Sequence, residues 1–338
     1  MNKNIKDRIS SNINLYNPED LKYKFLENES EATAYSYAFV FDKSYLMEKM
    51  LDKDLYNFTS EEIIQVLEGA DYSSHNSVEM AFRVIDKYIG YAIYNGKVNS
   101  SMKVTDTINK DMLYKFVNTS TKVLWSDKEI EEIVSNLVNY QDKAMVMGLN
   151  EGISGNDLGY TELLNLKLSD LNEDDCTVRL YNEKFGEERI LEISRKTMSL
   201  LRSAALEDTY LSKNGMSTGY KSEIELVKSP YIFRTAHSGK SASDTTDEKA
   251  SKFLITRRFT AIQEALEMNN LNAKNVRNSG MLKMAKDLYV EEGKLETPQL
   301  TKIAQRYGLK KTSDNVNYNF SLIKKFIRLE NIEALYNI

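Results

Sequence analysis

The chain has 338 residues, of which 41% are hydrophobic, so it is long and apolar enough for two domains with buried cores and is not globally disordered. No apolar run approaches the length of a bilayer span, and the first twenty residues lack the apolar segment of a signal peptide. The single cysteine, Cys176, excludes an intrachain disulfide and a Cys-based zinc site, so we expect a cytoplasmic protein without a metal or other cofactor.

The net charge of −5 is unevenly distributed along the chain. Residues 1–250 hold 30 Lys and Arg against 41 Asp and Glu, which gives −11, whereas residues 251–338 hold 15 against 9, which gives +6. A basic C-terminal part on an acidic body fits a surface that faces phosphates, although a solvated basic face explains the same count.

The first hundred residues predict a small helical module after a polar segment at residues 1–18. Apolar residues recur at nearly helical spacing between residues 32 and 51, and Thr59 or Ser60 caps a second helix with acidic residues in its first turn. A further helix begins between Ser74 and Ser77 and runs to Gly96. The apolar side chains assigned to the first of these helices are Tyr35, Ala38, Phe39, Phe41, Leu46 and Met50.

Residues 105–124 are mixed and polar, and we place an interdomain linker there, between a domain at 1–104 and a domain at 125–338. Ser126 followed by acidic residues is a strong signal for a helix start. Residues 177–181 and 189–194 have strand character, and residues 231–234 predict a further short strand. Helices are expected at 195–206, 253–268 and 323–335, with a polar exposed loop at 238–248.

Two stretches of the second domain carry recognisable motifs. Residues 159–171 read GYTELLNLKLSDL, and residues 274–283 read KNVRNSGMLK, followed by an amphipathic helix and then YGLKKTSDNVNY at 307–318. The first resembles the R-x-x-E-L-L-x-L-x-x-x-D-I line of the tyrosine recombinase (phage integrase) family. The second resembles the family's H-x-L-R-H-S motif, and the third resembles L-G-H with a tyrosine nine residues after the histidine.

This resemblance implies a mainly α fold with a small antiparallel sheet, in which two domains clamp DNA. Residues 1–104 correspond to the family's helical core-binding domain, and S-E-A-T-A-Y-S-Y at 30–37 is similar to one of its helices. Residues 125–338 correspond to its catalytic domain, which contains a three-stranded sheet.

The resemblance also assigns the family's catalytic positions, and several of them are degenerate here. Gly159 stands at the first arginine, Lys184 near the hairpin lysine, Lys274 and Leu309 at the two histidines, Arg277 at the second arginine and Tyr318 at the nucleophile. Paired guanidiniums stabilise the charge on a phosphate in the transition state, and losing one preorganised donor costs about two to three orders of magnitude in rate. We therefore expect a phosphate-binding pocket without turnover.

The resulting hypothesis is a sequence-specific binder of double-stranded DNA that acts as a transcriptional, prophage-lysogeny repressor, with a host or phage protein or an inducer as a further partner and no membrane. The expected DNA contacts are Lys184, Arg257, Arg258, Lys274, Arg277, Lys310, Lys311 and Tyr318. One alternative is an active, divergent recombinase that cleaves through Tyr318. In it, Lys274 and one arginine, either Arg179, Arg189 or Arg234, would substitute for the missing guanidinium. A second alternative is an accessory recombination factor or protein-binding module.

Overall fold

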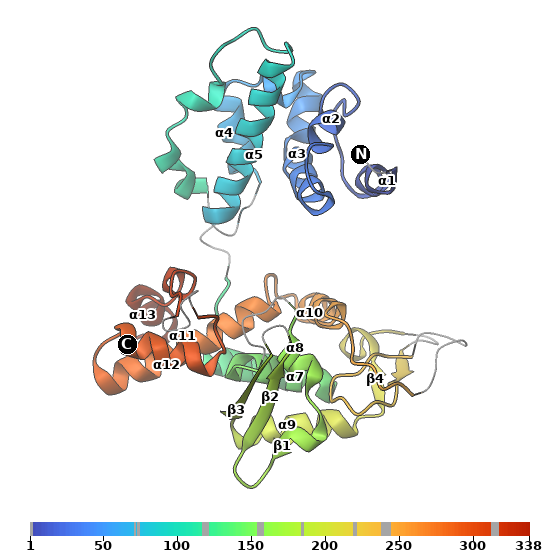
Figure 1. Cartoon of the computed structure of the whole chain (residues 1–338), viewed down its shortest axis with the longest axis vertical. Helices are drawn as coiled ribbons and strands as arrows, with labels where there is room; N and C mark the ends of the chain where they lie inside the picture. Colours follow the sequence, from blue (N-terminus) through green and yellow to red (C-terminus); the bar gives the residue numbers. More distant parts are fainter. Residues whose placement is uncertain are drawn as a thin grey trace. The chain divides into compact units, whose positions relative to one another are not determined.

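The computed structural model describes residues 3–70, 72, 75–116, 122–153, 159–183, 186–218, 222–237, 245–311 and 318–338. The chain forms two compact units, Met1–Thr121 and Lys122–Ile338, each with its own buried apolar clusters. Figure 1 shows that both units are built mainly from helices and that the second also holds the strands, which confirms the predicted fold class. Among the described residues, every helix falls short of the length or the apolarity that a membrane span requires.

The named elements in the described part of the first unit are all helices or 3₁₀ turns. Its helices are α1 (Lys3–Asn12), α2 (Lys22–Leu26), α3 (Glu31–Leu51), α4 (Ser60–Glu68) and α5 (His75–Tyr94), with 3₁₀ turns at Leu55–Asn57, Val104–Thr107 and Lys110–Phe116. The predicted cap of α4 is present, because the Thr59 side chain accepts a hydrogen bond from the Glu62 backbone and the Glu62 carboxylate accepts one from Thr59.

Two parts of the first unit differ from the sequence prediction. The segment at residues 1–18, which was predicted only to be polar, contains helix α1, whose Ile9 is fully buried. Residues 105–116, assigned to the linker, pack against α5 and bury Ile108, Leu113 and Phe116 in the core of this unit.

Helix α3 is apolar around most of its circumference, and the face predicted from its sequence is only partly the buried one. Ala38 and Phe41 are fully buried, whereas Phe39, Leu46 and Met50 are 46%, 70% and 85% exposed. The spacing of its apolar residues therefore identifies the helix but does not select the face that packs inward.

The second unit combines helices with two small antiparallel sheets. Its helices are α6 (Asp127–Asn136), α7 (Tyr140–Glu151), α8 (Thr161–Asn165), α9 (Arg195–Leu206), α10 (Phe253–Leu266), α11 (Ala273–Glu292), α12 (Thr297–Arg306) and α13 (Leu329–Tyr336), with 3₁₀ turns at Leu168–Asp170, Ser212–Gly215 and Ile323–Lys325. Strands β1 (Leu171–Asn172), β2 (Thr177–Asn182) and β3 (Glu187–Glu192) form one sheet in that order, and β4 (Thr209–Leu211) pairs with β5 (Glu223–Glu225).

The predicted helices and strands of this unit agree with the structure except near its C-terminus and at the predicted strand 231–234, and residues 238–244 of the predicted loop lie outside the described residues. The helix expected at 323–335 is divided into the 3₁₀ turn Ile323–Lys325 and helix α13. Residues 231–234 do not form a named strand, although Tyr231 makes an isolated antiparallel bridge to Lys167 and the Ile232 N–H donates to the Leu166 carbonyl at 2.8 Å.

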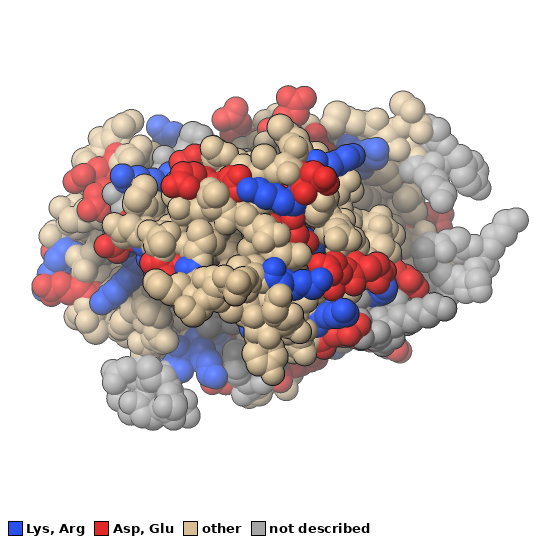
Figure 2. All heavy atoms as spheres, turned by 90° about the horizontal axis from the view of Figure 1, so that it is seen from above, with Lys and Arg blue, Asp and Glu red and all other residues tan. Residues whose placement is uncertain are grey.

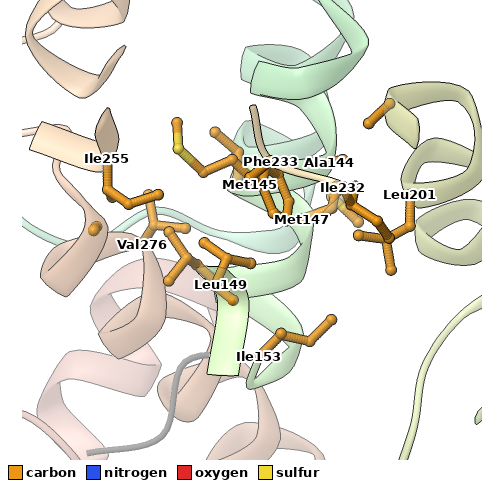
Figure 3. Close-up of a cluster of buried hydrophobic side chains, with 14 of the residues drawn as sticks. Ala144, Met145, Met147, Leu149, Ile153, Leu201, Ile232, Phe233, Ile255 and Val276 are labelled. Carbon is orange, nitrogen blue, oxygen red and sulfur yellow. The ribbon is translucent and has the colours of Figure 1, made fainter. Parts of the chain in front are cut away.

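Helix α7 lies at the centre of the second unit and is buried on nearly every side. Figure 3 shows Ala144, Met145, Met147 and Leu149 of this helix among side chains from neighbouring segments. Those neighbours include Leu201 of α9, Ile232, Phe233, Ile255 of α10 and Val276 of α11. The core thus fixes the position of α11, the helix that carries Arg277.

Candidate nucleic-acid interface

Helix α11 presents Lys274 and Arg277 at its N-terminal end. The helix begins after Asn272, whose side chain accepts a hydrogen bond from the Asn275 backbone at 3.0 Å. Lys274 is exposed and Arg277, one turn further on, is half-buried. Cations in the first turns lie against the positive end of the helix dipole, and the helix has no acidic residue in its first turn. A bound phosphate would offset this unfavourable arrangement.

A close backbone approach holds the first half of α11 against α7. A Cβ atom added to Gly280 would lie 1.8 Å from the carbonyl oxygen of Asn150, so only glycine fits this contact. The buried hydroxyl of Tyr307 donates to the same oxygen at 2.5 Å, and the Asn150 side chain donates to the Val276 carbonyl at 3.4 Å. Arg277 therefore projects from backbone that is fixed by α7 and by the end of α12.

Tyr318 is attached to the same helical cluster through its backbone and its ring. It forms an isolated antiparallel bridge with Lys311, and the Lys311 ammonium lies 6.0 Å from the centre of its ring. The ring is partly buried against the cluster formed by α11, α12 and α13, next to Phe320. Lys310 and Lys311 are both exposed.

Leu309, at the second histidine position, is 9% exposed and belongs to this apolar cluster. Gly159, at the first arginine position, immediately precedes Tyr160, which has a left-handed backbone conformation (φ 54°) at the start of α8. Neither position offers a charged or titratable side chain for phosphate chemistry.

Glu162, the glutamate of the recombinase-like motif, is buried beside Arg189 of β3. Two hydrogen bonds of 2.8 Å join the guanidinium to both carboxylate oxygens. Arg189 was one of three candidates for the missing guanidinium, and the structure gives all three a structural contact. Arg179 pairs with Asp170 at 2.7 Å, and the guanidinium of Arg234 donates to the carbonyl oxygens of Ala204, Ala205 and Glu207.

The remaining predicted contacts divide into accessible, buried and undescribed residues. Arg257 is exposed on α10. Its neighbour Arg258 is only 5% exposed, pairs with the buried Asp142 at 3.6 Å and donates to the Arg234 carbonyl, so the prediction that it contacts DNA is corrected. Lys184, the predicted hairpin lysine, lies outside the described residues.

Charge on one face of the molecule is locally mixed. On the face shown in Figure 2, Lys and Arg side chains alternate with Asp and Glu, and no broad field of one sign covers its described atoms. That face therefore offers no general basic surface for phosphates.

Comparisons with known proteins agree with the division into two domains. Residues 15–94 match the family model described as MrpR, N-terminal core-binding domain, and residues 124–337 match the model described as MrpR, C-terminal catalytic domain. These are the two domains that the resemblance to tyrosine recombinases implies, so that recognition is confirmed.

The chain is also similar to a curated bacterial protein and, more distantly, to solved recombinase structures. It is 32% identical over 299 residues to the SPbeta prophage-derived uncharacterized protein YopR of Bacillus subtilis (strain 168), covering 88% of this chain and 89% of that one. A lambda integrase dimer bound to a COC' core site is 13% identical, with 97% and 81% of the two chains covered and a TM-score of 0.49. XerA recombinase is 14% identical, with coverage of 94% and 97% and a TM-score of 0.40.

Proposed function

The chain belongs to the MrpR family, and from this premise we propose that it binds specific sequences in double-stranded DNA without cutting them. The biological role that we propose is transcriptional repression that maintains prophage lysogeny. Its relative YopR is derived from the SPbeta prophage, and the sequence resembles the repressor of SPβ-like Bacillus prophages.

The unequal survival of the catalytic positions carries this proposal. Arg277 is retained and Lys274 replaces a histidine, so both are cations on a fixed helix end. Gly159, in contrast, has no charge, and Leu309 is buried in an apolar cluster. The second arginine is kept as Arg277, whereas the guanidinium of the first arginine position and both imidazoles are lost. Since each preorganised donor is worth about two to three orders of magnitude in rate, strand cleavage is expected to be absent.

The contacts of the other arginines support the same view. Arg189 neutralises the buried Glu162, Arg234 is committed to backbone carbonyls, and Arg179 pairs with Asp170. Moving Arg189 or Arg234 to a phosphate would leave buried polar groups without these hydrogen bonds, which is costly.

DNA binding by this protein would combine two kinds of contact. Lys274, Arg277, Lys310 and Lys311 would pair with phosphates, so affinity would fall as salt concentration rises. Sequence preference would come from helix side chains of the first unit, which matches a model described as a core-binding domain, and from DNA shape.

The test begins with selection of bound fragments from the genome that encodes the protein, followed by gel shifts at near-physiological salt. A short recurrent motif that the wild-type protein binds is the expected result. A suicide substrate carrying that motif should give no covalent protein–DNA adduct.

Other outcomes would replace the proposal with a specific alternative. An adduct that disappears in Tyr318→Phe would identify a divergent recombinase. Sequence-independent retention of DNA that vanishes near physiological salt would instead indicate an accessory or protein-binding role.

A further inference from the structure

One face of α3 carries exposed residues at a regular spacing that the fold of the first unit does not use. Successive members are separated by four, three, four, three and four residues, and all of them are exposed. We call this set the α3 seam. It comprises Ala32, Ser36, Phe39, Lys43, Leu46 and Met50.

The average period of the seam is that of a coiled-coil heptad rather than that of a surface helix. Ala32, Phe39 and Leu46 are spaced by seven residues, and so are the other three members. A repeat of 3.5 residues keeps one stripe facing a partner helix along its whole length. The other side of α3 already packs into the core through residues such as Ala38 and Phe41.

We propose that the α3 seam is a self-association surface, on which α3 pairs in antiparallel orientation with α3 of a second copy of this chain. A two-fold axis midway between Phe39 and Lys43 makes the seam complementary to itself. The long Met50 then faces the small Ala32 of the other copy.

The remaining pairs of this arrangement also fit. Leu46 faces Ser36, whose hydroxyl is satisfied within its own helix by the Ala32 carbonyl at 3.0 Å. Lys43 faces the ring of Phe39, which is a favourable cation–π arrangement. A parallel pair would instead place Lys43 against Lys43, and this repulsion selects the antiparallel orientation.

The contact is short, because the seam spans 19 residues of one helix. It is smaller than the interfaces of permanent dimers, so we expect reversible association with a Kd between about 1 µM and 1 mM. Association of this strength would produce dimers mainly when two copies of the chain are held close together.

The first experiment is sedimentation of the full chain without DNA over a wide concentration range. Wild type is expected to shift reversibly from monomer toward dimer, and Leu46→Glu should remain monomeric. Tyr94→Glu is the matched control, because Tyr94 is also an exposed apolar residue of the first unit (88%) but lies outside the seam, and it should behave as wild type. Circular dichroism verifies that both variants fold.

The orientation is tested by disulfide formation in a Cys176→Ser background. The double variant Ser36→Cys/Leu46→Cys should form a cross-linked dimer under mild oxidation, whereas Leu46→Cys alone should not, because antiparallel pairing keeps the two 46 positions apart. Cross-linking of Leu46→Cys alone would overturn the antiparallel geometry. The proposal is also wrong if the wild-type protein stays monomeric or if the Leu46→Glu variant still dimerises. Either result would show that the α3 seam is not a self-association surface.

Discussion

The guanidinium of Arg189 in β3 holds both carboxylate oxygens of Glu162 in α8, each at 2.8 Å. Its remaining N–H groups donate to the carbonyl oxygens of Gly152 and Arg306, both at 2.6 Å. One side chain thus joins the end of α7, α8, β3 and the end of α12. Because α11 packs against α7 and α12, Arg189 also supports the helix that carries Arg277.

Arg189→Ala is therefore expected to destabilise the second unit strongly. The substitution leaves the Glu162 carboxylate, which is 3% exposed, without its cation, and removing one partner of a buried pair costs about 3–5 kcal/mol. The free energy of unfolding can be measured by urea denaturation at neutral pH.

Arg179→Ala on the adjacent strand provides the matched control for this measurement. The Arg179 side chain is 60% exposed in its pair with Asp170, so its loss should cost no more than about 1 kcal/mol. Equal losses in the two variants would show that the Arg189–Glu162 pair has no special role.

Arg277→Gln should weaken binding to every DNA sequence by a similar factor and lower the slope of log affinity against log salt by about one. The physical reason is the loss of one phosphate contact without loss of a base contact. Gel shifts across a salt series measure both quantities.

Arg202→Gln is the control for Arg277→Gln. Arg202 lies on α9 in an exposed ion pair with Glu173, so removal of its positive charge should leave the salt slope of DNA binding unchanged. A slope that is the same in wild type and Arg277→Gln would exclude Arg277 from the DNA contact. Thermal unfolding of each variant separates this result from a folding defect.

Local signals in the sequence were sufficient for much of the fold. Ser126 and Thr59 form the capping boxes that their neighbouring glutamates predict, and α9 has the predicted boundaries 195–206. Helix α7 escaped prediction because it is buried on nearly all sides and shows no helical alternation. Its polar Gln141 is satisfied by carbonyls of Ala204 and Ile232, which are distant in sequence.

The sequence could predict which residues belong to the candidate site, but it could not predict which residues they contact. The motif spacing identified Arg277, Tyr318 and the degenerate Gly159. It could not show that Glu162 pairs with Arg189, because these residues are 27 positions apart on separate elements. Nor could it show that Arg258 is buried, since its partner Asp142 comes from α7, a helix that the sequence did not reveal.

Gly280→Ala should be among the most damaging single substitutions in the second unit. The added Cβ would lie 1.8 Å from the Asn150 carbonyl oxygen and 2.4 Å from the Tyr307 hydroxyl, so α11 must move away from α7. Overpacking of this kind costs about 3 kcal/mol or more.

Gly90→Ala, also inside a helix, is the contrasting control for Gly280→Ala. Its Cβ would meet only the Lys103 side chain at an ordinary 3.5 Å, and higher helix propensity should stabilise the first unit by about 0.5–1 kcal/mol. Hydrogen exchange, which reports the two units separately, should show opposite changes. Tolerance of Gly280→Ala would mean that α7 and α11 can separate enough to admit the added methyl group.

A buried charge cluster in the first unit links its stability to pH. The Lys22 ammonium is fully buried and donates to Glu48 and Asp54, each at 2.7 Å. One cation therefore faces two carboxylates. Burial raises the pKa of Glu48, an effect that Lys22 opposes and Asp54 increases.

Hydrogen bonding around Glu48 is compatible with a proton on that carboxyl. The Ser44 hydroxyl lies 2.9 Å from the Phe41 carbonyl and 3.0 Å from the second Glu48 oxygen, and it has a single proton to donate. If Ser44 donates to Phe41, a protonated Glu48 completes the chain by donating to Ser44.

Glu48→Gln should consequently gain stability relative to wild type as pH rises. Because the folded pKa of Glu48 lies above its unfolded value, the folded state binds this proton more tightly, and wild type loses that contribution between the two pKa values. Urea denaturation of both proteins from pH 4 to 9 gives the difference between their free energies of unfolding. The contributions of the other titrating groups largely cancel in this difference. Lys22→Met should instead cost about 3–5 kcal/mol at neutral pH, because it leaves the two buried carboxyl groups of Glu48 and Asp54 without a cation. If Glu48→Gln is less stable than wild type by the same amount at every pH, the ionised carboxylate is required and the proton assignment fails.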